Sequence, residues 1–273
     1  MDLKHIAYLG YFHLLRAYWK VRGARVIAAM GQTYRFSPET EFPTHRRLRL
    51  PKGDCRSEIV RYTDFVQMHA CCQYCLTLLQ PVIVDVGAHH GAYAVVLGKI
   101  AQNRGGKLIA IEPNPTNFAI LRQNIMMNGL EETVALEQVA ITEKRSKIGL
   151  RSCGSQSYVT QRGLPGSVDV KGEPLAEVID RHQISAVDLL IIDVEGAELP
   201  VLSSFPWSRV EVGRIFCELH PNEWANFGYT PGDFREFLQK RGFLCLDMYY
   251  QEHELVPTSG YIGPCCLLGS KDR

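Results

Sequence analysis

Short apolar runs alternate with stretches of helical periodicity from Val82 onward. The apolar runs are VIVDVG, KLIAIEP, TVALEQVAI, VDLLIIDV and VGRIFCELH. Between them, the pattern predicts helices near residues 92–103, 115–128, 173–182 and 197–204. Near-continuous apolar runs such as LLIID fit parallel strands that are buried on both faces. The alternation therefore predicts an open, doubly wound α/β sheet.

The last part of the chain has a different pattern. A further helix is expected over residues 224–241, after Pro221. Two strand-like runs follow, GFLCLDMYY and GPCCLLGS, joined by a polar loop that leaves no room for a helix. Strands connected in this way pair antiparallel, so we expect an antiparallel pair at one side of the sheet.

The N-terminal segment has a strongly amphipathic pattern. Residues 3–30 read as a helix with His5, His13, Arg16 and Lys20 on one narrow face and aromatic and aliphatic side chains on a broad opposite arc. Such a basic amphipathic helix either docks on the rest of the chain or on a second subunit, or lies on an anionic membrane surface.

Three prolines predict irregular or extended chain over residues 31–53. A helical pattern resumes over residues 56–80. We therefore divide the chain into a basic, helical N-terminal extension, residues 1–80, and a main domain, residues 81–273.

Charge is unevenly distributed along the 273 residues. The formal net charge of the whole chain is +1, which does not favour binding to nucleic acid. Residues 1–56, however, hold eleven Lys and Arg against four Asp and Glu, and the remainder is acidic. The basic segment faces an anionic partner or packs on the acidic remainder of the same chain. The sequence does not indicate an oligomeric state.

The nine cysteines do not have the spacing of a disulfide framework or of a zinc site. Cys71, Cys72 and Cys75 lie in one apolar, helical segment, which favours buried thiols in a reducing compartment. The N-terminus lacks the apolar core and cleavage site of a secretory signal, and no window of about 20 residues is free of charge. We expect a cytoplasmic protein, with peripheral membrane contact if residues 1–30 bind lipid.

The turn after the first apolar run carries the first chemical signal. VIVDVGAHHG places Asp85 at a strand end, and Gly87 and Gly91 in a turn that leads into a helix. Open α/β sheets bind ligands at this edge, and glycine lets the backbone approach a ligand closely. A dinucleotide fingerprint needs glycine where His89 stands, so an NAD site is disfavoured. Glu112, at the end of the second run, can accept hydrogen bonds from both hydroxyls of a ribose.

Two further segments complete a family pattern. IIDVEGAE, at the fourth strand, and FCELH, at the fifth, follow DVGAHHG and AIEPNP along the chain. With these segments the sequence resembles the FkbM family of S-adenosylmethionine-dependent methyltransferases, over about residues 82–222. One position departs from the family, which usually has a lysine two residues before Asp193 where this chain has Ile191.

The resemblance implies the class I methyltransferase fold, a Rossmann-like, mostly parallel seven-stranded sheet whose last strand is antiparallel. It implies S-adenosyl-L-methionine as the cofactor, with Asp85 helping to hold the methionyl ammonium group and Glu112 binding the ribose. His90 would reach either the methionyl carboxylate or the acceptor, or neither. The cofactor-binding residues that the resemblance implies are Asp85, Gly87, Ala88, Gly91, Glu112, Pro113, Asn114, Ala140 and Asp193.

Family members mostly methylate hydroxyl oxygens of sugars, polyketides and similar small-molecule or glycan acceptors. An alcohol needs a base to take its proton, and we select His220, Asp193 and Glu218 as catalytic residues at the ends of strands four and five. His220 is the preferred base because histidine titrates near neutrality. Glu195 is a further candidate, or a cap for the next helix. A divalent metal on Asp193, Glu218 and His220 is an alternative that their spacing does not require.

Two segments are candidates for the border of the acceptor site. Residues 154–166 form a polar, glycine-rich loop that either covers the site or is an uninvolved surface excursion. Trp224 or Tyr229 either stacks on a sugar ring or only packs. Two other function classes stay open: a nucleotide-sugar or NAD-dependent enzyme, and a non-catalytic module that binds the cofactor or acts as a scaffold.

Overall fold

A mostly parallel sheet runs through the centre of the computed structural model, which describes residues 21, 23–29, 31–40, 65–153, 156–160, 165–247 and 263–268. The strands of this sheet, in spatial order, are β12 (Leu244–Asp247), β13 (Gly263–Leu268), β11 (Glu211–Leu219), β10 (Ala186–Ile192), β3 (Val82–Val86), β4 (Lys107–Ile111) and β5 (Val134–Glu137). β11, β10, β3, β4 and β5 are mutually parallel, and β13 is antiparallel to both of its neighbours. This confirms the predicted α/β class and the predicted C-terminal antiparallel pair.

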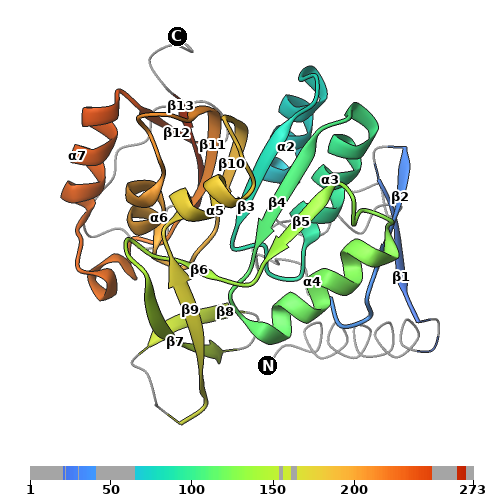
Figure 1. Cartoon of the computed structure of the whole chain (residues 1–273), viewed down its shortest axis with the longest axis horizontal. Coiled ribbons are helices and arrows are strands. Elements are labelled where there is room, and N and C mark those ends of the chain that lie inside the picture. Colours follow the sequence, from blue (N-terminus) through green and yellow to red (C-terminus); the bar gives the residue numbers. More distant parts are fainter. Residues whose placement is uncertain are drawn as a thin grey trace, which may run out of the picture.

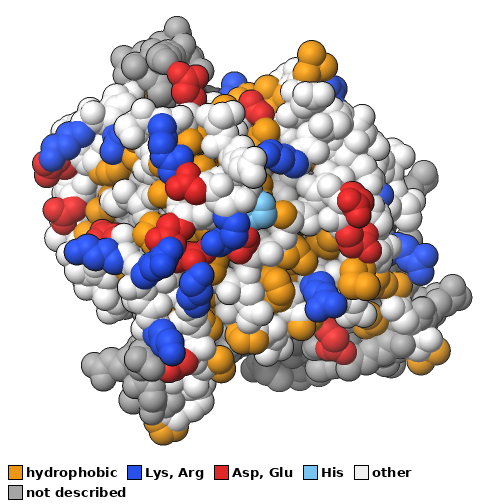
Figure 2. Space-filling view, viewed as in Figure 1, with side chains coloured by type: hydrophobic (Ala, Val, Ile, Leu, Met, Phe, Trp, Pro, Cys, Tyr) orange, Lys and Arg blue, Asp and Glu red, His pale blue; other side chains and the backbone are white. Residues whose placement is uncertain are grey.

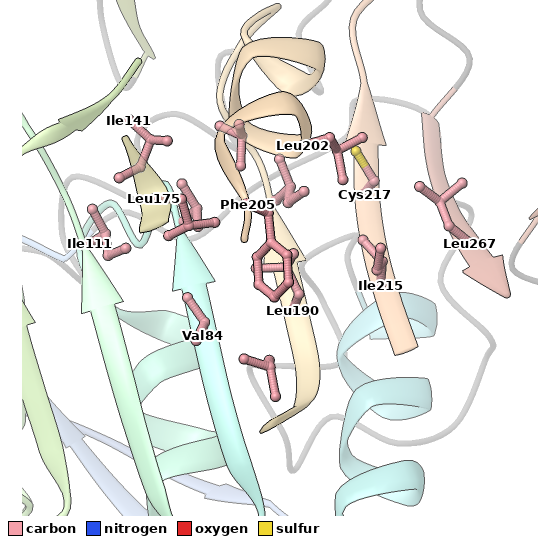
Figure 3. Close-up of a cluster of buried hydrophobic side chains, with 14 of the residues drawn as sticks. Val84, Ile111, Ile141, Leu175, Leu190, Leu202, Phe205, Ile215, Cys217 and Leu267 are labelled. Atoms are coloured by element: carbon pink, nitrogen blue, oxygen red, sulfur yellow. The ribbon is translucent and has the colours of Figure 1, made fainter. Parts of the chain in front are cut away.

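Helices cover both faces of the sheet (Figure 1). α2 (Phe65–Thr77), α3 (Ala92–Arg104) and α4 (Pro115–Met127) contribute to the hydrophobic core on one face. α5 (Leu175–Arg181), α6 (Glu198–Ser204) and α7 (Pro231–Arg241) contribute to the core on the other. The buried side chains between the sheet and the second group are shown in Figure 3, where Val84, Leu190 and Ile215 come from three neighbouring strands.

Four helices predicted from the apolar pattern are confirmed, and two predictions need correction. The single helix predicted over 224–241 is a short 3-10 helix, η2 (Trp224–Phe227), followed by α7. Gly228 separates them with a positive φ of 79°, and Thr230 and Pro231 begin the new helix with a capping box. The run TVALEQVAI is likewise divided between β5 and β6 (Ala140–Ile141), which belong to different sheets.

The predicted N-terminal helix over 3–30 is wrong at its C-terminal end. β1 (Arg25–Ala29) and β2 (Gln32–Phe36) form an antiparallel hairpin that turns at Gly31. β2 is extended chain, as predicted for residues 31–53, of which 31–40 are described, and its Tyr34 and Phe36 alternate into the core on the α2 and α3 side. Residues 1–20 lie outside the described residues, so an amphipathic helix there, and its membrane contact, stay predictions.

The hairpin is held on α4 by side-chain amides. Asn128 Oδ1 accepts a hydrogen bond from the Arg35 amide at 2.9 Å, and Asn124 Oδ1 accepts one from the Ser37 amide at 2.6 Å. Figure 1 shows the blue hairpin beside α4. These contacts, and the shared core, mean that the described part of the predicted extension packs on the main domain. The boundary at residue 80 stays a prediction.

A second, four-stranded sheet corrects the predicted loop over 154–166. Its order is β6, β9 (Ser167–Glu173), β7 (Ser146–Cys153) and β8 (Gln156–Thr160), and it projects below the central sheet in Figure 1. β8 occupies residues expected to be loop, while 154–155 and 161–164 lie outside the described residues. β9 mixes exposed and buried positions and lacks a continuous apolar run, so the apolar pattern did not reveal it.

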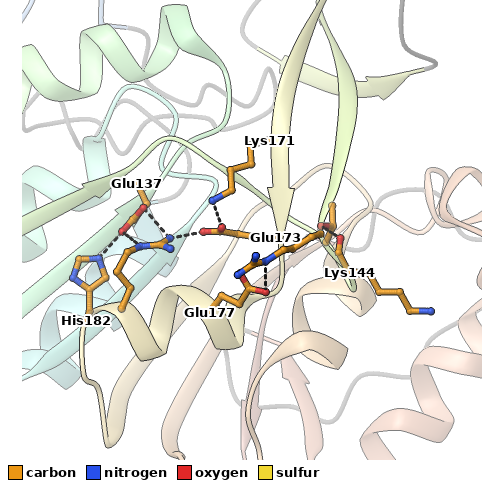
Figure 4. Close-up of polar contacts among 9 residues, drawn as sticks. Glu137, Lys144, Lys171, Glu173, Glu177 and His182 are labelled. Carbon is orange, nitrogen blue, oxygen red and sulfur yellow. Dashed lines mark hydrogen bonds and ion pairs between the residues drawn. The ribbon is translucent and has the colours of Figure 1, made fainter.

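An ion-pair network joins the second sheet to α5 and β5 (Figure 4). Arg181 Nε lies 2.9 Å from Glu137 Oε1, and Arg181 also pairs with the buried Glu173, which Lys171 contacts from β9. His182 Nε2 lies 2.7 Å from Glu137 Oε1. Because paired charges can be buried where isolated ones cannot, this network lets Glu173 sit inside the molecule.

The cysteines of α2 are buried thiols outside any disulfide, as predicted. Burial raises the pKa of Cys72 to about 12, which leaves its thiol protonated and unreactive. Among the helices of the described residues, none combines the length and the apolar character needed to cross a membrane. On the face shown in Figure 2, basic and acidic side chains are interspersed, in keeping with the small net charge.

Candidate active site

The parallel register of the central sheet brings the predicted site residues to one edge. Asp85 lies near the end of β3, Glu112 directly follows β4, and Asp193 directly follows β10. Glu218 is the penultimate residue of β11, and His220 follows that strand. Because these strands are parallel, their carboxyl ends meet at one edge, which is where open α/β sheets bind ligands.

The turn between β3 and α3 contains glycines for reasons internal to the protein. Gly87 has φ 91°, and a Cβ added there would lie 1.8 Å from the backbone oxygen of Asp193. Gly91 has φ 83°, and its Cβ would lie 2.5 Å from Leu121 Cδ1. From the sequence, these glycines are expected to make room for a ligand. The structure instead places protein atoms where each Cβ would be, so tight packing already requires glycine at both positions.

Ala88 and Ala140 direct their side chains into hydrophobic clusters. Ala88 is buried in the core formed with α3. Ala140 pairs with Gly172 in the second sheet and packs against Leu150 and Val170. Cofactor contacts from Ala88 and Ala140 therefore stay predictions.

Glu112 is a buried carboxylate with a fixed orientation. Its Oε1 accepts a hydrogen bond from the Asn114 amide at 2.8 Å, and its Oε2 accepts one from the His89 amide at 2.8 Å. Burial raises the pKa of Glu112 to about 7, against the opposing effect of these bonds and of one from Asn117. A carboxylate offers about four acceptor positions, so Glu112 keeps capacity for further donors such as ribose hydroxyls.

The histidines of the turn, His89 and His90, help to hold the Glu112 carboxylate in place. His90 Nε2 lies 3.2 Å from Asn117 Oδ1, and its ring stacks on His89 with centroids 3.9 Å apart. His90 therefore faces the start of α4, where Asn117 in turn bonds Glu112. Asn114 caps the same helix through its side chain, which accepts from the Thr116 amide at 2.9 Å. Adenine contacts by Asn114 and by the half-buried Pro113 stay predictions.

Asp85 is the most unusual polar group at this edge. It is buried, and no hydrogen bond within the described residues reaches its Oδ2. Burial first, and then the charge of Glu112, raise the pKa of Asp85 to about 7. A buried carboxylate oxygen without a donor is costly unless a ligand supplies one. Asp85 therefore fits a cationic ligand group such as the methionyl ammonium of S-adenosylmethionine.

His220 lies among three carboxylates. Its Nδ1 is 2.8 Å from Glu198 Oε1, while its Nε2 is 3.3 Å from Glu195 Oε2 and 3.9 Å from Glu218 Oε1. Burial lowers the pKa of His220, but the hydrogen bond and charge of Glu198, with the charges of Glu195 and Glu218, outweigh burial and raise the pKa to about 9. The ring is therefore mostly a cation at neutral pH, unlike the near-neutral titration expected from histidine alone.

Glu198 is a site residue that the sequence argument missed. Its side chain is fully buried, and it is the last acid of the DVEGAE segment. That segment carried the family resemblance, but only the tertiary structure shows that Glu198 turns back to contact His220. α6 begins at Glu198 with Ala197 as its N-cap, so Glu195 lies outside the helix that it was expected to cap.

The carboxylates around His220 could also hold a cation. Asp193, Glu195 and His220 each offer one ligand atom, and these atoms lie within 4.8 Å of one another. The sequence argument had grouped Asp193 and His220 with Glu218 instead. The structure groups Asp193 and His220 with Glu195, which has a positive φ of 50°, in place of the Glu218 that was expected.

The aromatic residues after β11 serve packing. Trp224 is fully buried and stacks on Tyr229 and Phe234, with ring centroids 5.3 and 5.0 Å apart. Tyr229 is also buried. Neither ring presents a face to a sugar, so the packing alternative is confirmed for both.

The profile described as "Methyltransferase FkbM domain" matches residues 85–245, which is more than half of the chain and includes every site residue above. The chain belongs to this family. It is therefore a methyltransferase, with S-adenosylmethionine as the methyl donor. The match confirms the family suggested by DVGAHHG, AIEPNP and DVEGAE.

Two relatives and one solved structure show the extent of the similarity. Methyltransferase sdnD of Sordaria araneosa is 24% identical over 196 residues, covering 60% of this chain and 73% of sdnD. The hexuronic acid methyltransferase AglP of Haloferax volcanii is 24% identical over 160 residues, covering 58% of this chain and 62% of AglP. The structure of methyltransferase FkbM from Methylobacillus flagellatus aligns with a TM-score of 0.44 at 13% identity, covering 77% of this chain and 59% of that one.

Proposed function

We propose that this methyltransferase transfers a methyl group to a hydroxyl oxygen of a sugar, glycan or similar small acceptor. Its membership of a methyltransferase family supports the reaction, and the hexuronic acid named for one relative supports a sugar-like acceptor. The observation that carries the proposal is His220, whose Nε2 lies at the carboxyl edge of the sheet with carboxylates on either side.

The residues at this edge fit the cofactor. Asp85 would hold the methionyl ammonium, and Glu112 would accept hydrogen bonds from the ribose hydroxyls. When bound, S-adenosylmethionine supplies an electrophilic methyl group on a positively charged sulfur. Asp85 and Glu112 are both buried, and burial raises the pKa of each to about 7, so both are partly protonated at neutral pH. Donors from a ligand would therefore stabilise the ionised form of each acid.

Residues of the chain itself would orient the acceptor hydroxyl and provide the base that takes its proton. Asp193 and Glu218 would orient the acceptor hydroxyl at the carboxyl ends of β10 and β11. His220 Nε2 would accept the hydroxyl proton as the oxygen forms its new bond to carbon, with the carbon–sulfur electron pair leaving on sulfur. The ring must lose its own proton first, and Glu195, which lies 3.3 Å from Nε2 and is partly exposed, could receive it.

The charge of the site restricts the acceptor. Asp193, Glu195 and Glu218 place carboxylates around His220, where the reacting oxygen would lie. Close like charges disfavour an anionic acceptor group. We therefore propose a neutral hydroxyl, not a carboxylate, as the methylated group.

A direct test is the activity of His220→Gln with a panel of neutral sugars and glycosides. We expect kcat to fall about 10²–10⁴-fold, the usual contribution of a general base, while calorimetry shows unchanged affinity for S-adenosylmethionine. Calorimetry on the wild type with S-adenosylmethionine and NAD separates the other function classes. Binding of NAD in place of S-adenosylmethionine, or cofactor binding without turnover on any acceptor, would contradict the proposal.

If the reaction depends on a metal, chelation should abolish turnover, whereas the base scheme predicts that chelation has no effect. Asp193, Glu195 and His220 could hold a divalent cation that binds the acceptor oxygen and lowers the pKa of its hydroxyl. Turnover that is undiminished in EDTA supports the base scheme. Activity lost in EDTA and restored by Mg²⁺ or Mn²⁺ would replace it by the metal scheme.

A further inference from the structure

Glu198 accepts hydrogen bonds from four separate donors. Its Oε1 receives the Gly196 amide at 3.0 Å and His220 Nδ1 at 2.8 Å. Its Oε2 receives Trp224 Nε1 at 2.7 Å and the Tyr229 hydroxyl at 3.0 Å. The Tyr229 hydroxyl also lies 2.8 Å from the Gly196 carbonyl oxygen, so its single hydrogen is shared between Gly196 and Glu198. The other three donors alone use most of the acceptor capacity of a carboxylate. Glu198 is therefore held in one orientation inside the protein.

This fixed carboxylate determines the proton position on the neutral His220 ring. Because Glu198 is a pure acceptor, Nδ1 must be the nitrogen that carries hydrogen. The lone pair of the neutral ring is then on Nε2, the nitrogen that faces Glu195, Glu218 and the open edge of the sheet. A ring with the opposite tautomer would present a hydrogen, not a lone pair, to the acceptor.

We infer that Glu198 is a positioning residue for the methyl transfer, which holds His220 in the tautomer and orientation that expose Nε2 to the acceptor hydroxyl. The inference rests on the proposed role of His220 as base. Glu198 itself is buried at the start of α6 beneath the ring and acts only through His220.

The geometry separates this role from simple packing. Trp224 and Tyr229 bond only Oε2, whereas His220 and Gly196 bond only Oε1. Glu198→Gln keeps the volume but replaces one oxygen by a donor. If the amide nitrogen faces His220, Nδ1 must become the acceptor and the ring adopts the wrong tautomer. If the amide nitrogen faces Trp224, it meets the indole N–H, which is also a donor. Stability then falls, but His220 keeps its tautomer.

The experiment is a double-mutant cycle with Glu198→Gln, His220→Gln and the double variant. We expect Glu198→Gln to lower kcat about 10²–10⁴-fold, the upper end being the cost of a wrong tautomer in another histidine-based site, with little change in the KM for S-adenosylmethionine. The double variant should be no slower than His220→Gln, because both changes remove one function. Trp224→Phe, which removes a donor to Oε2 only, is the matched control: it should lower thermal stability and change kcat by less than about threefold.

A measurement on the wild type keeps the inference testable if Glu198→Gln does not fold. Long-range ¹H–¹⁵N spectra recorded above pH 9, where the ring is neutral, should show the His220 proton on Nδ1. A proton on Nε2 overturns the inference. Two kinetic results would also overturn it. One is a double variant in which the kcat losses of the two single variants multiply; the other is a Trp224→Phe variant whose kcat is as low as that of Glu198→Gln. If His220→Gln retains full activity, the proposed base itself is wrong.

Discussion

Asp85 and Ile191 are direct neighbours in the central sheet, paired across β3 and β10. Side chains at paired positions of parallel strands point to the same face, so the Asp85 carboxyl lies beside the branched apolar side chain of Ile191, which is itself buried. On its other side, Asp85 pairs with Ala110. Ile191 is also the position where the family usually has lysine. Asp85 therefore has apolar neighbours on both sides in the sheet, and burial, followed by the charge of Glu112, raises its pKa.

The first prediction concerns stability and pH. Because the native pKa of Asp85 is above its unfolded value, the native state holds more protons between about pH 4 and 7, and the free energy of unfolding should fall as pH rises through that range. Each extra native-state proton contributes about 1.4 kcal/mol per pH unit. Denaturant titrations of the cofactor-free protein at several pH values should show this slope. Asp85→Asn should reduce this slope and leave the part contributed by Glu112, whose pKa is also raised to about 7, whereas substitution of the exposed Glu131 by Gln should not change it.

The neighbouring position allows a sharper test. In Ile191→Lys, an ammonium group beside Asp85 would favour the ionised carboxylate and lower the pKa of Asp85. We expect the pH dependence between pH 4 and 7 to shrink as in Asp85→Asn. Ile191→Met has a similar length without charge and should retain the wild-type slope. Equal slopes in the lysine and methionine variants would show that the two side chains do not interact.

Cofactor binding should release protons. Contact between the methionyl ammonium and Asp85 would lower a pKa of about 7 and ionise the carboxyl. Calorimetric titrations near pH 6.5 in buffers of different ionisation enthalpy should therefore report net proton release with S-adenosylmethionine or S-adenosylhomocysteine. Asp85→Asn should remove the part that comes from Asp85, while Glu112, whose pKa is also raised to about 7, can still release a proton when it binds the ribose. Binding without proton release would mean that the ammonium group does not contact Asp85.

The rate of methyl transfer should rise with pH. Since the pKa of His220 is raised to about 9 and the base must be neutral, kcat/KM should increase through neutrality and level off near pH 9. The positive sulfur of the bound cofactor should lower this pKa, so kcat should level off at a lower pH than kcat/KM. Initial rates from pH 6 to 10 test both statements. A profile that falls above neutrality, or that is unchanged in His220→Gln, would argue against this base.

Two glycines provide a matched pair for the β3–α3 turn. Gly87 and Gly228 both have positive φ, 91° and 79°, but only at Gly87 would a Cβ collide with another strand's backbone, 1.8 Å from the Asp193 oxygen. Gly228→Ala should cost about 1 kcal/mol from backbone strain alone. Gly87→Ala should cost several kcal/mol, since β3 and β10 must separate. Thermal unfolding measures both, and similar losses would mean that the turn adapts easily.

The sequence determined the central sheet and the edge that carries the site. Apolar runs ending in Asp85, Glu112 and Asp193 are local signals, because strands buried on both faces must be apolar throughout and strand order follows from the α/β connections. The glycine turn and DVEGAE likewise indicated the family without a structure. By contrast, β9 mixes exposed and buried positions and has no such run, and β1 lies within a segment whose pattern reads locally as one helix.

Only the tertiary structure decided how the acids and histidines are partnered. Glu198 and His220 are separated by 22 residues, yet they meet at 2.8 Å, and the resulting charge cluster reverses the effect of burial on the pKa of His220. His90 Nε2 lies 3.2 Å from Asn117 Oδ1 of α4, and a contact of His90 with the cofactor or the acceptor stays a prediction. Asp85 has Ile191 beside it because the parallel register of β3 and β10 pairs the two positions. The sequence contains these residue types, but their protonation states depend on distances and burial that are set when distant segments pack together.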